Sequence, residues 1–279
     1  MKKVIVILLA AALLLSVVGC KKAENKKLTV AMSPDFAPME FVDTSKSGQE
    51  QYVGFDVTLA NFLADELGME LEIKPMSFDA CMTAVQLGSV DMAISGFSWK
   101  PDRAENFLLS DYYIAGDNET QQSVITVKAK ENTCKTQADF SGWKVGAQAS
   151  SLQEQLVKDE LIPAGAELVV YKSIDDAVLA LQTGKIDALA VAHGNGEAII
   201  ANNPDLAFTG FDFDVDPKYE NNVILLNKSN TEMLEKVNQV LAKAMAAGVY
   251  DGWYEDAKAL AGIPTAADVS YDDDGKPVS

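Results

Sequence analysis

The chain has 279 residues, of which 23 are basic and 41 acidic, and its net charge of −18 argues against nucleic acid or anionic lipid headgroups as partners. A hydrophobic fraction of 48% is typical of a globular protein, and the length allows two domains. One histidine and three cysteines, without metal-ligand spacing, predict neither a metal site nor a cofactor. Cys81 and Cys134 are expected as free thiols, with a disulfide between them as the alternative.

The amino-terminal segment predicts export. Two lysines precede an apolar or small stretch over 4–18, and Val17-Val18-Gly19-Cys20 follows at once. About 15 apolar residues are fewer than the roughly 20 that cross a bilayer, so we interpret 1–19 as a lipoprotein signal peptide rather than an uncleaved membrane anchor. Cleavage leaves Cys20 lipidated and 20–26 as a tether, and the loss of two lysines lowers the net charge from −18 to −20. We expect the mature protein on the extracytoplasmic face of the cell membrane.

Runs rich in β-formers alternate with helical patterns along the mature chain. We expect strands at 27–32, 71–74, 90–95, 123–127, 144–147, 168–171, 186–192 and 223–226. We expect helices near 55–67, 78–87, 151–160, 173–183, 195–201 and 231–247. This alternation predicts α/β layers with largely parallel sheets. The acidic tail over 263–279 has no apolar period and is predicted to be disordered.

One stretch occurs twice. Residues 77–91 and 173–187 share Ser, Asp, Ala, Gln, Gly and Asp at the same spacing, and each predicts a Ser N-cap, an amphipathic helix, a Gly end and a strand. The repeat indicates two similar lobes, although two short αβ units can also agree by chance. Ligands of open α/β sheets bind beyond the carboxyl ends of strands. The ends Ser95–Ser98 and Val191–Gly194 are therefore expected to face each other across a cleft. The second end carries the single histidine, where an apolar run stops and a glycine-rich turn is expected.

Two positions near these strand ends suit an anion. Arg103 is the only arginine beside 22 lysines, and a guanidinium grips a carboxylate or phosphate bidentately. Arg103 and Ser98, which lies upstream, form a candidate anion-binding site. The alternative is that Arg103 makes a surface ion pair on the short helix that begins at Pro101. In the second lobe, Ser150 and Ser151 open a helix whose first N–H groups suit an anion, or simply cap that helix.

Five blocks, taken together, resemble the solute-binding proteins of polar amino acid ABC importers, family 3. The blocks are 54–60, 95–104, 110–113, 145–151 and 184–188, in the family's order, and the resemblance covers roughly 27–262. It implies a two-lobed, type II periplasmic-binding-protein-like α/β fold, with two crossover strands and the ligand cleft between the lobes. Lobe one is then 27–120 with 219–262, and lobe two is 121–218.

The resemblance implies a monomeric receptor that binds a polar amino acid or related small carboxylate-bearing amine and delivers it to an ABC permease. Alternatives are a receptor for a betaine or small carboxylate, a cyclic-carboxylate dehydratase, or a sensor domain. No acid–base residue or nucleophile–base pair stands out, so we expect no enzyme and no catalytic residue. The disordered acidic tail argues against a sensor domain.

Carried over by position, the resemblance implies roles for individual residues. Arg103 and Ser98 hold the solute's carboxylate, helped by backbone amides around Ser150 and Ser151. Phe36 and Phe78 are expected to sandwich the side chain of the solute, with packing in the core as the alternative. The other residues expected in the pocket are Ser33, near the first strand, and Ser95, Gly96 and Phe97, at the strand end.

One departure from the family pattern concerns the solute's amine. Family members that bind α-amino acids have an aspartate at the position of Ala192, where it pairs with the α-ammonium, and often a threonine at the position of Leu152. An ammonium buried without a carboxylate costs several kcal/mol. Either His193, Asn195 or Glu197 takes this role, or the solute has no primary ammonium, which the residues slightly favour. For His193 a helix-start or surface position is the simpler interpretation.

Overall fold

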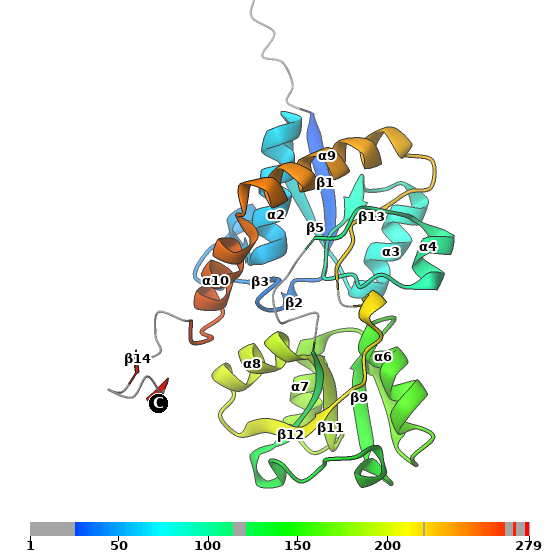
Figure 1. Cartoon of the computed structure of the whole chain (residues 1–279), viewed down its shortest axis with the longest axis vertical. Coiled ribbons are helices and arrows are strands. Elements are labelled where there is room, and N and C mark those ends of the chain that lie inside the picture. Colours follow the sequence, from blue (N-terminus) through cyan, green and yellow to red (C-terminus); the bar gives the residue numbers. More distant parts are fainter. Residues whose placement is uncertain (1–25, 114–120, 220, 266–269, 272–276, 279) are drawn as a thin grey trace, which may run out of the picture.

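The computed structural model describes residues 26–113, 121–219, 221–265, 270–271 and 277–278, which fold into two α/β lobes, one above the other in Figure 1. The predicted signal peptide and Cys20 lie outside the described residues, as does most of the predicted tail. Within that tail, β14 (Ser270–Tyr271) and β15 (Pro277–Val278) pair in an antiparallel fashion. No helix in the described part of the chain is both long and apolar enough to cross a bilayer.

Lobe one contains a five-stranded sheet in the order β5-β1-β6-β13-β7 and a small sheet in the order β2-β3-β4. Its strands are β1 (Lys27–Met32), β2 (Asp35–Phe36), β3 (Glu40–Val42), β4 (Tyr52–Val53), β5 (Glu70–Pro75), β6 (Met92–Ala93), β7 (Leu108–Leu109) and β13 (Leu225–Leu226). Its helices are η1 (Gly48–Gln51), α2 (Phe55–Leu67), α3 (Phe78–Leu87), α4 (Pro101–Asn106), α9 (Thr231–Ala247) and α10 (Tyr250–Leu260).

Lobe two contains a five-stranded sheet in the order β10-β9-β11-β8-β12. Its strands are β8 (Gln122–Val127), β9 (Lys144–Gln148), β10 (Glu167–Tyr171), β11 (Ala188–Ala192) and β12 (Leu206–Asp212). Its helices are η2 (Lys128–Lys130), η3 (Gln137–Phe140), α6 (Leu152–Leu156) with the π-helical turn η4 (Val157–Leu161), α7 (Ile174–Gln182) and α8 (His193–Asn202). The short helix η5 (Pro217–Tyr219) follows on the way back to lobe one.

The repeated segment has the same role in both lobes. Asp91 precedes β6, and its carboxylate accepts a hydrogen bond from the backbone N–H of Thr29 at the start of β1 (2.7 Å). Asp187 precedes β11, and its carboxylate accepts from the backbone N–H of Lys144 at the start of β9 (3.0 Å). In each lobe an αβ unit is thus fixed to the strand next to the central one by an equivalent aspartate.

Two connections join the lobes, through 110–121 and 213–224. At the end near lobe one, the N–H of Tyr113 donates to Asn222 O (3.0 Å); at the other end, the N–H of Phe213 donates to Gln122 O (2.8 Å). The described ends of the two connections therefore lie side by side.

The structure corrects three expectations. Each large sheet is mixed rather than largely parallel, because β13 and β8, which adjoin the connections, run antiparallel to their neighbours. The expected glycine-rich turn after β11 is the first turn of α8, where Gly196 lets the helix approach Phe208 closely: a Cβ there would lie 2.7 Å from the ring. Helix α10 was not predicted; it packs Tyr250 and Tyr254 against Phe55, with ring centroids 5.9 and 6.1 Å away.

Candidate functional site

A cavity of about 30 Å³ lies between the lobes at the carboxyl ends of β6 and β11. The residues that line it from lobe one are Phe36, Phe78, Ser95, Gly96, Ser98 and Arg103. The residues that line it from lobe two are Gln148, Ser151, Leu152, Gln153, Ile174, Leu189, Ala190, Val191, Ala192 and Asn195. The volume holds about one water molecule, so a larger molecule requires the lobes to move apart.

Arg103 on α4 connects the two walls. Its side chain is 2% exposed, and Nη1 donates to Ser98 O (2.5 Å) within lobe one while Nη2 donates to Ser150 O (3.0 Å) in lobe two. The guanidinium also lies 5.5 Å from the ring centroid of Phe78 and 5.3 Å from that of Phe97. These contacts hold a permanent positive charge in a fixed plane beside the cavity, where a carboxylate can be bound.

Aromatic rings form the apolar part of the lobe-one wall. The rings of Phe78 and Phe97 are stacked, with centroids 4.5 Å apart. Gly96 has φ +54°, and a Cβ on it would lie 2.6 Å from Cε1 of Phe36. The glycine therefore allows both the left-handed backbone and the close approach of Phe36, which places that ring on the cavity.

A buried carboxyl pair lies behind this wall. Ser95 Oγ donates to Glu40 and accepts from the N–H of Ser33 (3.0 Å), while Asp56 accepts from the N–H of Gly96 (2.8 Å) and from the hydroxyl of Tyr113 (3.1 Å). Glu40 Oε2 and Asp56 Oδ1 are buried and receive no other donor from the described residues, so a proton shared between the carboxyls satisfies both.

Burial dominates the protonation of this pair. It raises the pKa of Asp56 to about 7, and burial together with the negative charge of Asp56 raises the pKa of Glu40 well above its usual range. The protonated form of Glu40 is therefore favoured in the folded protein. The hydroxyl proton of Ser95 is used on Glu40, so Ser95 presents only an acceptor to the cavity.

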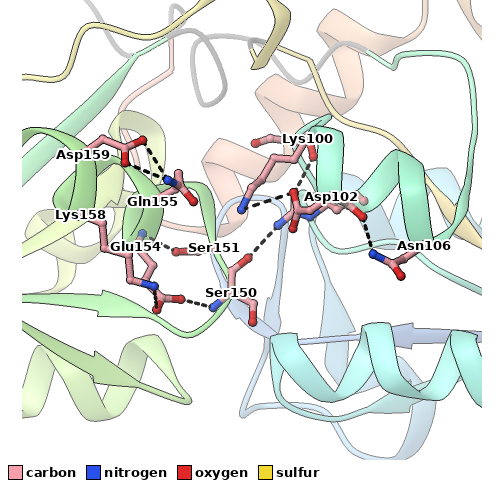
Figure 2. Close-up of polar contacts among 11 residues, drawn as sticks. Lys100, Asp102, Asn106, Ser150, Ser151, Glu154, Gln155, Lys158 and Asp159 are labelled. Carbon is pink, nitrogen blue, oxygen red and sulfur yellow. Dashed lines mark hydrogen bonds and ion pairs between the residues drawn. The ribbon is translucent and has the colours of Figure 1, made fainter.

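The start of α6 faces α4 across the cleft, as Figure 2 shows. Ser150 has φ +65°, and its N–H donates to Glu154 Oε2 (2.5 Å). The hydroxyl of Ser151 caps the helix by accepting from the N–H of Glu154 (3.0 Å). On the lobe-one side, Lys100 is 9% exposed and lies 3.9 Å from Asp102. Burial and then the nearby Arg103 lower the pKa of Lys100.

The strand end in lobe two is apolar. All five residues of β11 are buried, and Ala192 lies on the cavity. His193 instead points to the strands beside the connections: its ring stacks on Phe208 (4.6 Å between centroids), and Nδ1 lies 2.9 Å from the hydroxyl of Ser123, which donates to Asp212 (2.6 Å).

Further hydrogen bonds join the two lobes across the cleft. Asp35 of lobe one accepts from the N–H of Ile174, the first residue of α7 (2.8 Å), and from the amide of Gln148 (3.3 Å). Burial raises the pKa of Asp35. Asn195 donates to Ala37 O (2.9 Å), and Asn202 donates to Ala261 O after α10 (3.1 Å). The two lobes are thus in direct contact.

The structure brings together most of the residues selected from the sequence. On the cavity are Phe36, Phe78, Ser95, Gly96, Ser98, Arg103, Ser151 and Ala192. Not among its lining residues are Ser33, Phe97, Ser150 and His193, and their contact with a solute stays a prediction. Sequence analysis missed Gln148, Gln153 and Ile174 as wall residues. Gln148 ends a strand and the other two start helices, positions that the strand-end rule could have flagged.

The state of the cysteines agrees with the expectation of free thiols. Cys81 and Cys134 are both free and buried. Among the described residues, no group of three or more His, Cys, Asp or Glu is placed to hold a metal ion.

Comparison with known proteins identifies the family. Residues 28–256 match the profile of the bacterial extracellular solute-binding proteins, family 3. The chain belongs to this family. It is therefore an extracytoplasmic solute-binding protein rather than an enzyme.

Solved structures and curated proteins give the same assignment. An amino acid ABC transporter substrate-binding protein, AbpA, from Streptococcus pneumoniae, solved with L-arginine, is 35% identical, with a TM-score of 0.76 over 86% of this chain and 97% of that one. The P235GK mutant of ArgBP from T. maritima is 31% identical, with a TM-score of 0.73 over 84% and 95%. The arginine-binding extracellular protein ArtP of Bacillus subtilis is 28% identical over 247 residues, which cover 86% of this chain and 92% of ArtP.

Proposed function

We propose that the protein is the receptor of an ABC importer: it captures a small amino-acid-like carboxylate between its lobes and delivers it to a membrane permease. The observation that carries this proposal is Arg103, a buried guanidinium that lies on an interlobe cavity beside two apolar rings. A carboxylate is its natural partner, because the planar fork of donors matches two carboxylate oxygens. Arginine or histidine is bound by relatives, according to their names, which supports a solute of amino-acid size.

We further propose how the receptor is anchored and how its chain is divided between the lobes. The chain is tethered to the membrane through lipidated Cys20 and acts as a monomer. Lobe one comprises 27–120 and 219–262, lobe two comprises 121–218, and the two close on the solute about the paired connections.

A thermal-shift screen tests the proposal. The protein from Cys20 onward, with Cys20→Ser to keep it soluble, is screened against the common amino acids, glycine betaine and small carboxylates. A solute present at 100 times its Kd should stabilise the protein by roughly 2.7 kcal/mol, which appears as a rise in Tm. Calorimetry then gives the affinity. If no carboxylate-bearing compound raises Tm, the proposed function is wrong.

A further inference from the structure

We infer that the cleft selects a net anionic solute, a carboxylate that carries no cationic group and whose planar or apolar body lies against Phe36 and Phe78. This inference rests on the proposed function and narrows its substrate class. It comes from the charges and hydrogen bonds around the cavity, which are distributed very unevenly between the two walls.

Positive charge is concentrated on the lobe-one side. Among the described residues that line the cavity, Arg103 alone is charged. Lys100, three residues earlier, is largely buried next to it, and its ion-pair partner Asp102, 3.9 Å away, is two-thirds exposed. Lys100 thus adds a second basic group beside Arg103, behind the cavity wall, and solvent around Asp102 screens the charge of Asp102. A solute that enters as an anion is stabilised by this field, whereas a cationic group is repelled.

The carboxylates nearest the cavity are already engaged. Glu154 accepts from the N–H of Ser150 (2.5 Å) and pairs with Lys158 (2.7 Å), as Figure 2 shows. Asp35 accepts from the N–H of Ile174 (2.8 Å) behind Gln148, and from the hydroxyl of Ser33 (2.8 Å). None of these carboxylates lines the cavity.

Two further carboxyl groups lie behind the lobe-one wall of the cavity. Glu40 and Asp56 are fully buried behind Ser95 and Gly96, where they hold the strand end in place. An ammonium in the cavity would therefore be buried beside Arg103 without a counter-charge, which is strongly unfavourable.

The lobe-two wall opposite Arg103 suits an uncharged part of the solute. Leu152, Ile174 and the β11 residues up to Ala192 supply methyl groups. The amide nitrogens of the polar residues here donate to protein oxygens: Gln148 to Asp35 and Gln153 to Gln122 (2.6 Å). Neutral acceptors such as Ser95 Oγ can receive an uncharged N–H, for example from an indole or amide, but they supply no charge.

Matched pairs of compounds test the inference, because each pair differs only in the α-ammonium. The pairs are L-alanine and propanoate, L-glutamine and glutaramate, L-phenylalanine and 3-phenylpropanoate, and L-tryptophan and indole-3-propanoate. L-Arginine, which has a net positive charge, and glycine betaine, a zwitterion with a quaternary ammonium, serve as comparison compounds that carry a cationic group. Calorimetry at pH 7.5 on the wild-type protein should show at least tenfold tighter binding of the des-amino member in every pair that binds. Equal or tighter binding of an α-amino acid, arginine or betaine overturns the inference and leaves the receptor function intact. Failure of every carboxylate overturns the receptor function itself.

Variants at Ala192 provide a second measurement. Ala192→Asp adds a carboxylate at the apolar strand end and should reverse the preference within the pair that binds best. Ala192→Asn adds the same volume without the charge and should weaken both members without reversing their order. Leu179→Asp, on the exposed face of α7, adds the same charge away from the cavity and should leave the preference unchanged. An unreversed preference in a folded Ala192→Asp protein, judged by its Tm, contradicts the charge argument.

Discussion

The two lobes carry equivalent strand ends into the cleft, but their chemistry is opposite. In lobe one, β6 leads into Ser95–Ser98, whose backbone and hydroxyls are bonded to Arg103, Glu40 and Asp56. In lobe two, β11 leads to Ala192 and directly into α8, and the equivalent side chains are apolar or point away. The sheet orders and the anchoring aspartates are the same on both sides.

This difference separates the scaffold from the site. The repeated αβ unit fixes where the strand ends lie, and a few side chains after each strand decide what those ends can bind. Lobe one supplies the charge and the rings, whereas lobe two supplies apolar surface and hydrogen bonds to lobe one. We therefore expect changes in lobe one to affect the binding energy of the carboxylate, and changes at the contact between lobes to affect closure. The three predictions below test this division, in order of expected effect.

The largest effect is expected for Arg103→Lys. Lysine keeps the charge but loses the planar fork that contacts Ser98 O and Ser150 O, and a point charge cannot bind a carboxylate bidentately. Affinity for the best solute of the screen should fall by about 1.5 to 3 kcal/mol, the range for hydrogen bonds to charged groups. Calorimetry measures this directly, with Lys158→Arg on the turn η4, where the side chain is exposed, as the control. Unchanged affinity would show that the carboxylate is bound elsewhere.

The next effect concerns the pH dependence of lobe one. Because the pKa values of Glu40 and Asp56 are raised in the folded protein, folded chains bind more protons than unfolded chains above pH about 4, so the free energy of unfolding falls as pH rises. Glu40→Gln mimics the protonated acid: its amide can accept from Ser95 and donate to Asp56. Its stability should match wild type near pH 5 and exceed it toward pH 8, by at most about 1.4 kcal/mol per pH unit.

Urea unfolding between pH 5 and 8 measures this difference. Glu40→Ala removes both hydrogen bonds and should be less stable than wild type at each pH up to 7. Parallel pH profiles for wild type and Glu40→Gln would refute the shared proton.

The sequence predicted those parts of the molecule that depend on local signals. The expected spans 27–32, 55–67, 78–87 and 231–247 agree with the observed elements, since regular apolar periods and glycine ends mark them. Helix α10 was missed because Gly252 weakens its local preference, and packing of its aromatic residues against Phe55 stabilises it instead.

The candidate site divides in the same way. Arg103, Ser98 and the phenylalanines were visible as motif residues, and so was the missing acid at Ala192. The carboxyl pair was not visible, because Glu40 and Asp56 are 16 residues apart and each looks like an ordinary surface acid until the chain folds. The contact of Asp35 with α7 spans 139 residues, a separation for which one sequence carries no signal.

Asp35→Asn should have the smallest effect, and it separates closure from direct binding. Asp35 lies behind the cavity wall, where its carboxylate accepts from Ile174 N–H and from Gln148. Asparagine has the same shape, but its NH₂ group must face one of these donors, so about 0.5 to 1.5 kcal/mol of interlobe hydrogen bonding is lost. That loss should appear as weaker solute affinity through faster dissociation, because an opened cleft releases its solute. Stopped-flow measurements of the change in protein fluorescence on solute binding give the association and dissociation rates. Asp176→Asn changes an exposed carboxylate two residues after Ile174 on α7, removes the same charge from the surface and should change neither rate. A slower association rate with unchanged dissociation would show instead that Asp35 acts while the lobes are apart, and the division between a charge-binding lobe and a closing lobe would fail at this residue.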